Sequence, residues 1–226
     1  RSSKNSEIPT GDIEIDVKDL RVLSKSETPP FDIVENCQTA ELTRLKYRYL
    51  DLRRPDMQRR LILRSKVCQI ARNFFADNGF FEIETPILMK STPEGARDYI
   101  VPTINAPGEF YALPQAPQQF KQLLMCGGVD KYFQIAPCFR DEDPRADGLA
   151  GDFYQIDMEM AFATQEDIFN VMEGLFKGIF EKFTDQKVVT PFKRIKYVDA
   201  MRDYCSDKPD LRNPLKVVDV TDVFAD

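Results

Sequence analysis

The sequence contains no histidine and no tryptophan among its 226 residues. Without an imidazole, Ser-His-Asp hydrolysis, histidine-ligated zinc and histidine general bases are all excluded. No apolar run approaches the roughly 18 residues that a membrane helix needs, and the N-terminal segment 1–6 lacks the apolar core of a signal peptide. We therefore expect no membrane partner and a cytoplasmic protein, with an organelle matrix left open as the alternative.

Cysteines are few and scattered: there are five, with no C-x-x-C pair. This spacing predicts neither a disulfide framework nor a zinc site, and favours buried small hydrophobes. The net charge of −6 argues against a broad basic surface, so any nucleic-acid contact must be local. The length predicts one large domain or slightly more. Because the chain opens with Arg1 and stops at Asp226 just after an apolar run, we expect a fragment.

The N-terminal part alternates between apolar and polar residues. Over 11–23 the alternation predicts a half-buried strand, with Ile13, Ile15 and Val17 on one face. The following polar segment, 24–31, contains two prolines and predicts a linker and a domain boundary.

Three helices are predicted from apolar spacing and end signals. The first is long and amphipathic, with Asp56 as its N-cap and Gly79 as its stop, and leads into an extended segment that ends at Pro86. The other two are predicted over 118–125, before two glycines, and over 165–183, behind a threonine cap.

Two strands, 132–140 and 153–162, flank a twelve-residue loop rich in charge of both signs. Strand alternation places five side chains on one face: Arg140, Phe153, Gln155, Asp157 and Glu159. A guanidinium suits a phosphate, and paired carboxylates suit an ammonium or a metal ion. The face therefore suits a substrate that is both anionic and aminated, although a solvated hairpin is the simpler alternative.

Two further segments carry candidate polar groups. The segment 91–98 follows the proline-ended strand, and its composition does not distinguish a binding loop from an ordinary turn. Gln118 and Lys121 lie three residues apart and therefore on one helix face, which is equally typical of a solvated helix. Neither Gly-rich nucleotide-binding loop, G-x-x-x-x-G-K-[ST] or G-x-G-x-x-G, is present.

Five sequence motifs carry a strong family resemblance. They are L-K-Y-R-Y-L-D-L-R-R at 45–54, T-P-E-G-A-R-D-Y at 92–99, Y-A-L-P-Q-A-P-Q-Q-F-K-Q-L-L at 111–124, F-R-D-E-D at 139–143 and S-D-K-P-D-L-R-N-P at 206–214. With them the chain resembles, over nearly its whole length, the class II aminoacyl-tRNA synthetases, and within these the bacterial type of aspartyl-tRNA synthetase.

The resemblance implies an α+β fold: a class II antiparallel sheet flanked by helices and preceded by the tail of an OB-fold β-barrel. Residues 1–30 would end the anticodon-binding OB-fold domain and its linker, and 31–196 would be the catalytic domain with motifs 1 and 2. Residues 197–226 would lead into an inserted domain. The long helix and Pro86 resemble motif 1, which implies a homodimer, and 132–162 resembles motif 2.

The implied function is that of an aspartate–tRNA ligase, which activates aspartate with ATP and transfers it to the 3′ end of tRNA(Asp). Mg²⁺ is also implied, but the family's carboxylate ligands and motif 3 come later than this chain extends, so the chain alone would be an incomplete enzyme. A non-catalytic synthetase-like module that binds RNA or dimerises is the alternative. Whether tRNA(Asn) is also charged is left open.

On the nucleotide side, the resemblance implies that Arg140 binds the ATP α-phosphate and the aspartate carboxylate. It implies that Glu142 contacts the adenine side of the nucleotide and the end of the tRNA. The Phe153 ring would stack on adenine. Arg145 and Asp147 would face the tRNA acceptor end.

On the aspartate side, the resemblance places three residues around the substrate ammonium: Glu94, Gln155 and Asp157. Gln118 would orient aspartate, and Lys121 would bind its side-chain carboxylate.

Two positions depart from the family pattern. Gly148 stands where an arginine is usual, and Ala116 where a serine is usual. The first change removes a phosphate contact and the second a hydroxyl near the aspartate pocket, so both are expected to tune affinity.

Overall fold

The computed structural model describes residues 4–143 and 151–224. The chain divides into two compact units, Arg1–Ile62 and Leu63–Asp226, and the predicted domain boundaries at 30 and 196 stay predictions. No helix in these described residues is long and apolar enough to cross a membrane.

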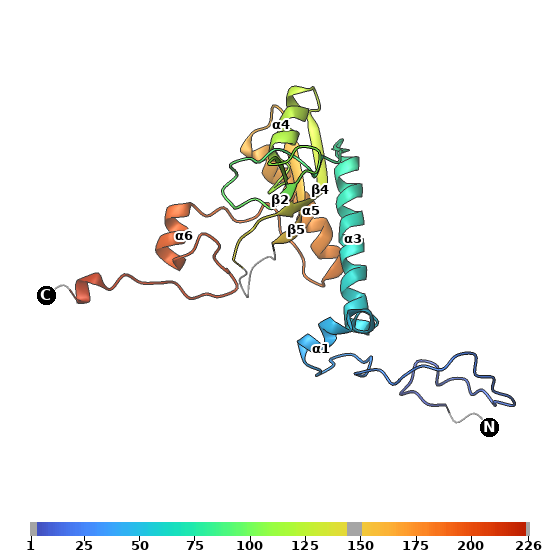
Figure 1. The fold of residues 1–226 in the computed structure, drawn as a ribbon. Coiled ribbons are helices and arrows are strands. Elements are labelled where there is room, and N and C mark those ends of the chain that lie inside the picture. The colour runs from blue at the N-terminus through green and yellow to red at the C-terminus, as the bar shows by residue number, and fades with distance from the viewer. Residues whose placement is uncertain (1–3, 144–150, 225–226) are drawn as a thin grey trace. The chain divides into compact units, whose positions relative to one another are not determined.

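Helices and strands follow one another along the chain as Figure 1 shows. In order, the described elements are α1 (Glu41–Lys46), α2 (Arg48–Asp51), α3 (Pro55–Asp77), β1 (Phe81–Glu82), β2 (Ile100–Pro102), β3 (Phe110–Ala112), α4 (Gln118–Cys126), β4 (Lys131–Phe139), β5 (Asp152–Met160), α5 (Gln165–Phe183), α6 (Tyr197–Tyr204) and the 3₁₀ helix η1 (Thr221–Val223).

The strand predicted over 11–23 is wrong. These residues form no strand in the described chain, and Ile13, Ile15 and Val17 are 65–78% exposed. A strand needs a partner for its backbone groups, whereas the hydrogen bond from the Ile13 amide to the Thr10 carbonyl is a local turn contact. The OB-fold tail therefore stays a prediction.

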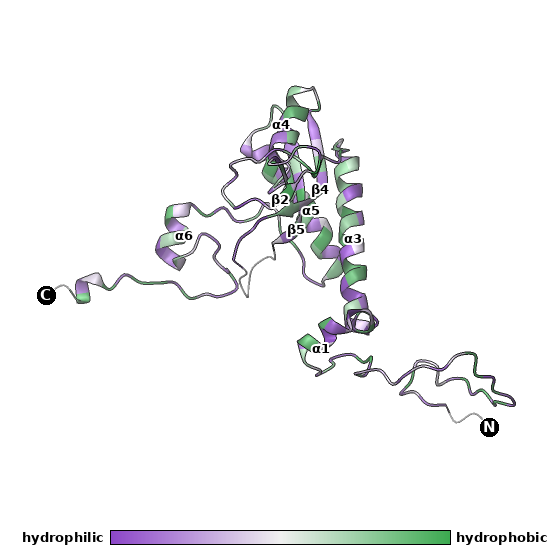
Figure 2. Cartoon of the chain, in the orientation of Figure 1, coloured by the Kyte–Doolittle hydropathy of each residue, from purple (hydrophilic) through white to green (hydrophobic). Residues whose placement is uncertain are grey.

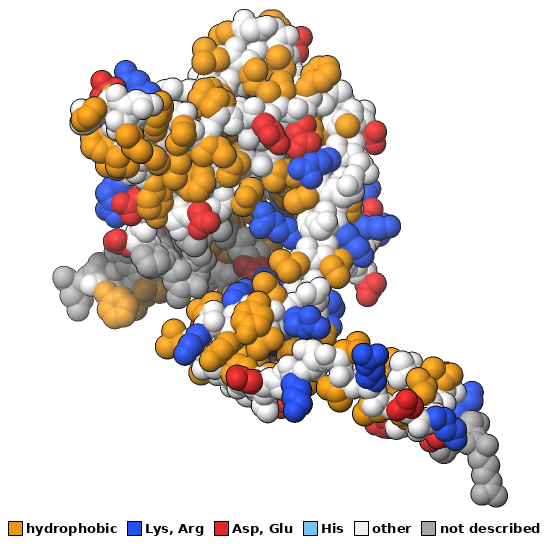
Figure 3. All heavy atoms as spheres, turned by 45° about the vertical axis from the view of Figure 1, so that its right-hand side comes forward, with side chains coloured by type: hydrophobic (Ala, Val, Ile, Leu, Met, Phe, Trp, Pro, Cys, Tyr) orange, Lys and Arg blue, Asp and Glu red, His pale blue; other side chains and the backbone are white. Residues whose placement is uncertain are grey.

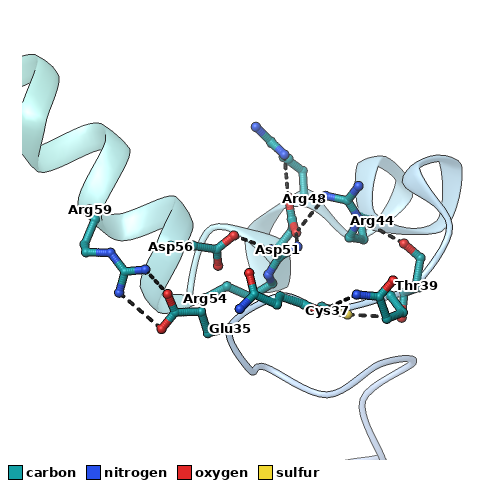
Figure 4. Close-up of polar contacts among 11 residues, drawn as sticks. Glu35, Cys37, Thr39, Arg44, Arg48, Asp51, Arg54, Asp56 and Arg59 are labelled. Carbon is teal, nitrogen blue, oxygen red and sulfur yellow. Dashed lines mark hydrogen bonds and ion pairs between the residues drawn. The ribbon is translucent and has the colours of Figure 1, made fainter.

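The first unit contains a network of arginines and carboxylates around Asp51, whose side chain is wholly buried (Figure 4). Asp51 accepts hydrogen bonds from Arg48 and from Arg54, the latter at 2.9 Å, and Arg44 lies 3.7 Å away. Arg54 also pairs with Asp56. Because a buried carboxylate requires such partners, the network explains the arginine-rich motif at 45–54 and fixes α1 and α2 to the start of α3.

The long helix α3 begins two residues earlier than predicted. Pro55 is its first residue, so Asp56 is not the N-cap, and the Gln58 amide donates to the Arg54 carbonyl at 2.9 Å. Proline suits this position because the first amides of a helix have no partner within it. The predicted stop is confirmed: α3 ends at Asp77, and Gly79 adopts the left-handed conformation with φ of +78°.

The main sheet has the order β1-β4-β5. β4 and β5 are antiparallel, as predicted, with Lys131 opposite Met160 and Phe139 opposite Asp152. β1, however, runs parallel to β4, with Phe81 opposite Tyr132. The sheet is therefore mixed, not antiparallel throughout, because the chain between β1 and β4 crosses over through β2, β3 and α4.

Two other predicted helices are confirmed. α4 starts at Gln118 and ends at Cys126, before the two glycines. α5 spans Gln165–Phe183 and begins with a capping box. There the Thr164 amide donates to Asp167 Oδ2 at 2.7 Å, and the Asp167 amide donates to Thr164 Oγ1 at 3.4 Å.

The core of the second unit lies between α3, α5 and the apolar face of the sheet. Hydrophilic and hydrophobic residues alternate along α3 (Figure 2). From this helix Phe75 stacks on Phe133, with the ring centroids 4.7 Å apart. The buried members of the cluster are Ala71, Phe75, Phe80, Phe133 and Leu175. Ile156, Met158 and Met160, on the face of β5 opposite to Asp157, pack on it, whereas Tyr154 on the same face is 57% exposed.

Candidate active site

The polar face of β4 and β5 forms the floor of the candidate site. The register puts Gln134 opposite Asp157 and Cys138 opposite Phe153. Helix α4 lies against both strands and brings Lys121 to this face. The structure therefore brings together residues that the sequence separates by more than thirty positions.

Lys121 is the buried cation of the site, with 8% of its surface exposed. Its Nζ lies 2.8 Å from Asp157 Oδ1 and 3.2 Å from Glu159 Oε2. Burial lowers the pKa of this ammonium, but the two carboxylates outweigh burial and the pKa is raised. Lys121 is therefore charged at neutral pH.

Asp157 contributes an oxygen that still lacks a donor. Burial raises the pKa of its carboxyl, and the Lys121 ammonium counteracts that rise. Although Oδ1 is paired with Lys121, Oδ2 is buried and has no hydrogen-bond partner among the described residues. A ligand that donates a hydrogen bond, such as an ammonium group, would satisfy this oxygen.

Tyr132 and Gln134 belong to the same floor, opposite Glu159 and Asp157. Tyr132 is wholly buried, and its hydroxyl donates to Gln134 Oε1 at 2.7 Å. Thr85 Oγ1 donates to the same oxygen at 3.0 Å. Burial raises the pKa of the Tyr132 phenol, so the hydroxyl remains a donor. Sequence analysis did not identify these positioning groups.

Cys138 lies in the middle of the floor and is wholly buried. Its thiol donates to Gln155 Oε1 at 3.4 Å. Burial raises the pKa of the thiol to about 11, so it is neutral at physiological pH and is no nucleophile. The prediction that the cysteines are buried hydrophobes is confirmed for Cys138 but is wrong for Cys126 and Cys205, which are exposed.

Arg140 is at the end of the polar face and lies over Phe153, 5.0 Å from its ring centroid. In the described part of the chain its guanidinium forms no ion pair, whereas Asp157 and Glu159 are both paired with Lys121. Arg140 therefore does not hold the sheet together through these carboxylates. Glu142 is exposed, and its amide donates to the Arg140 carbonyl at 3.0 Å.

The segment 91–98 borders the same site. Glu94 is half-buried and accepts a hydrogen bond from Thr92 Oγ1 at 3.1 Å. The Asp141 amide donates to the Arg97 carbonyl at 2.9 Å, which joins the segment to the end of β4. Gln115, which sequence analysis did not single out, also binds this segment. Its position between two prolines at the start of α4 was the available signal.

One predicted site residue, Gln118, is not brought into contact with the rest. Gln118 is exposed at the first position of α4, and its side chain makes no hydrogen bond within the described residues. Arg145 and Asp147 lie outside the described residues, as does Gly148. Their roles stay predictions.

The described residues do not fit the implied Mg²⁺. Within the described ranges, 4–143 and 151–224, no group of three or more Cys, Asp or Glu side chains could hold a metal ion. The two carboxylates closest together, Asp157 and Glu159, are both paired with the Lys121 ammonium. No catalytic step is therefore derived through a metal ion.

The family model for "tRNA synthetases class II (D, K and N)" matches residues 40–224. An aspartate–tRNA(Asp/Asn) ligase of Gluconobacter oxydans (strain 621H) is 56% identical over 228 residues, which cover 100% of this chain and 38% of the relative. An aspartate–tRNA ligase of Ruminiclostridium cellulolyticum is 56% identical over 221 residues, covering 98% of this chain and 37% of the relative. The chain thus spans little more than a third of the length of these curated relatives.

The fold is similar to that of a solved structure. Asparaginyl-tRNA synthetase from Pyrococcus horikoshii, complexed with asparaginyl-adenylate, gives a TM-score of 0.66 at 24% identity, covering 75% of this chain and 38% of that one. At this identity the likeness supports the fold alone.

Proposed function

We propose, from the premise that this chain belongs to the class II tRNA synthetases (D, K and N), that the protein is an aspartate–tRNA ligase. It activates aspartate with ATP to aspartyl-adenylate and transfers the aspartyl group to the 3′ end of tRNA(Asp). The observation that carries the proposal is the buried Lys121 beside Asp157, whose Oδ2 has no hydrogen-bond partner within residues 4–143 and 151–224. A cation and an unsatisfied anionic oxygen at one place suit a small substrate with both a carboxylate and an ammonium.

On the aspartate side, Lys121 binds the substrate's side-chain carboxylate. As a buried point charge it favours a carboxylate over the neutral amide of asparagine. Asp157 Oδ2 accepts from the substrate ammonium, and Glu94 and Gln155 border the same group. Gln118, at the exposed start of α4, orients the bound amino acid.

On the nucleotide side, Arg140 binds the α-phosphate and the reacting carboxylate. Phe153 stacks on adenine, and because the guanidinium already lies over this ring, the phosphate and base sites are adjacent. Glu142, exposed just after Arg140, borders the adenine and the tRNA end.

In the first step, an oxygen of the aspartate α-carboxylate bonds to the ATP α-phosphorus as the bond to the bridging oxygen breaks, and pyrophosphate leaves. In the second, the terminal 3′-hydroxyl of tRNA attacks the aspartyl carbonyl, and AMP leaves. The nucleophile of the first step is already anionic, so orientation and cationic charge from Arg140 drive the step without a side-chain nucleophile. A site without histidine and with a neutral Cys138 is suited to this chemistry.

The proposal includes two macromolecular partners. Arg145 and Asp147 contact the acceptor end of tRNA(Asp). A second copy of the chain packs on the exposed Pro86 region, where apolar side chains accumulate. They are Phe81, Ile87 and Leu88, each 46–65% exposed. Figure 3 shows that many apolar side chains lie at the surface in the view that it draws. Leu88→Arg is expected to shift the protein toward monomers in sedimentation velocity.

The test of the proposed activity is ATP–pyrophosphate exchange by the full-length protein with aspartate, asparagine or lysine as the amino acid. We expect exchange with aspartate alone. Exchange driven by asparagine or lysine would overturn the substrate assignment, and no exchange with any of them would favour the non-catalytic module. Charging of tRNA(Asp) and tRNA(Asn) transcripts then separates the two activities named among the relatives.

A further inference from the structure

Gln115 is a buried amide at the point where the chain enters α4, with 2% of its surface exposed. Its Oε1 accepts from the Ala96 amide at 3.0 Å, and its Nε2 donates to the Ala96 carbonyl at 2.9 Å. Nε2 also donates to Asp98 Oδ1. One side chain thus satisfies both backbone groups of a single residue, as a neighbouring strand would.

The other contacts of the segment 91–98 are more exposed. Ser91 Oγ donates to Asp98 Oδ2 within the segment itself. Arg97 is 3.7 Å from both Asp141 and Asp143, but these ion pairs are at the surface, where solvent weakens them. The bonds from Gln115 therefore link this segment to the residues just before α4.

The segment carries Glu94, and α4 carries Lys121. Glu94 lies two residues before Ala96, and the bond from the Asp141 amide to the Arg97 carbonyl holds the same segment at the end of β4, beside the site floor. Lys121 lies six residues after Gln115, over the same floor. Gln115 is consequently the residue that joins the two sides of the candidate pocket.

We propose that Gln115 is a positioning residue that fixes the segment 91–98 so that Glu94 faces the same pocket as Lys121. Its role in catalysis rests on the proposed function, whereas its role in holding the segment does not. The two roles can be tested separately.

Hydrogen exchange of the chain tests the structural role. Gln115→Met keeps the length of the side chain and removes all three hydrogen bonds. We expect the Ala96 amide to exchange at least about tenfold faster, because its acceptor is lost, while the amides of α5 are unaffected. Gln119→Met, on the exposed part of α4, is the matched control. Unchanged protection of Ala96 would overturn the proposal.

A second pair of variants covers the case in which Gln115→Met fails to fold. Gln115→Glu keeps the acceptor for the Ala96 amide but replaces the donor with a carboxylate facing Asp98, so the segment should open. Adding Asp98→Asn restores a donor opposite the new carboxylate and should recover the protection of the segment. Failure of this rescue, in a folded protein, contradicts the assigned geometry.

A double-mutant cycle in the full-length protein tests the catalytic role. Gln115→Met should raise the KM for aspartate about tenfold and leave the KM for ATP nearly unchanged. In a Glu94→Gln background it should raise the aspartate KM little further, because the positioned group is already gone. Fully additive effects would mean that Gln115 does not act through Glu94. If the wild-type protein shows no ATP–pyrophosphate exchange, only the proposed function is rejected. The role of Gln115 in holding the segment is still tested by hydrogen exchange of the Ala96 amide.

Discussion

Lys121 Nζ and Asp157 Oδ1 lie 2.8 Å apart, across 36 positions of the sequence, and form the buried ion pair of the candidate site. The pair uses one oxygen of Asp157 and leaves the other without a donor among the described residues. Glu159 shares the ammonium at 3.2 Å. The site is thus already ordered before a ligand arrives, which limits the entropy that binding must remove.

Replacing Lys121 with methionine removes this ammonium while keeping the length of the side chain. In the full-length protein we expect kcat/KM for aspartate to fall more than about tenfold, which is about 1.4 kcal/mol of transition-state stabilisation, with little change in the KM for ATP. Lys182→Met, exposed near the end of α5, is the control. Steady-state pyrophosphate exchange measures both constants, and an unchanged aspartate dependence would place Lys121 outside the pocket.

Arg140→Gln removes a charge that has no ion-pair partner in the described chain. If Arg140 contacts the α-phosphate, adenylate formation should fall on the order of 10²-fold, because the charge acts mainly in the transition state. The melting temperature should stay near that of the wild type. Arg64→Gln is a matched control, since Arg64 lies over the Tyr154 ring, 4.5 Å from its centroid. A destabilised Arg140 variant with normal exchange per folded molecule would reject the assignment.

Thr164→Ala removes the hydroxyl that caps the N-terminus of α5. The Thr164 hydroxyl and Asp167 satisfy each other's amides, so the loss should lower the free energy of unfolding by about 1 kcal/mol. Urea unfolding followed by circular dichroism measures the change. Thr164→Ser retains the hydroxyl and should be close to the wild type; a serine variant as unstable as the alanine variant would argue against the cap.

The ion pairs of Asp203 should make the melting temperature of the protein depend on pH in the acid range. Arg202 and then Lys216, whose Nζ is 2.6 Å from Asp203, lower the pKa of this carboxyl from 3.8 to about 2. A carboxyl whose pKa is lower in the folded state stabilises the fold above 3.8, and this contribution is lost as the pH falls toward 2. The melting temperature of Asp203→Asn should therefore lie below that of the wild type near neutral pH and converge with it near pH 2. A gap of constant size would contradict the ion-pair explanation.

Local signals in the sequence determined both ends of α5 and the C-terminal end of α3, but not the start of α3, where Asp56 is not the N-cap. The hydroxyl of Thr164 can satisfy an amide three residues away, and Gly79 can adopt a left-handed conformation, so each position is recognisable without knowledge of the fold. The alternation over β5 likewise indicated which side chains share the face with Asp157. The predicted bounds of α5 and the predicted stop of α3 are accordingly confirmed.

Contacts between distant segments were decided only by the tertiary structure. The alternating residues 11–23 form no strand because strand formation depends on a partner, and β1 pairs parallel to β4 because of the crossover between them. The sequence supplied Lys121 and Asp157 as candidates, but an ion pair across 36 residues follows from how α4 packs on the sheet. The hydrogen bonds between Gln115 and Ala96 also follow from the tertiary structure. A side-chain amide can bond to the backbone of any residue, and only the fold specifies which residue lies beside it.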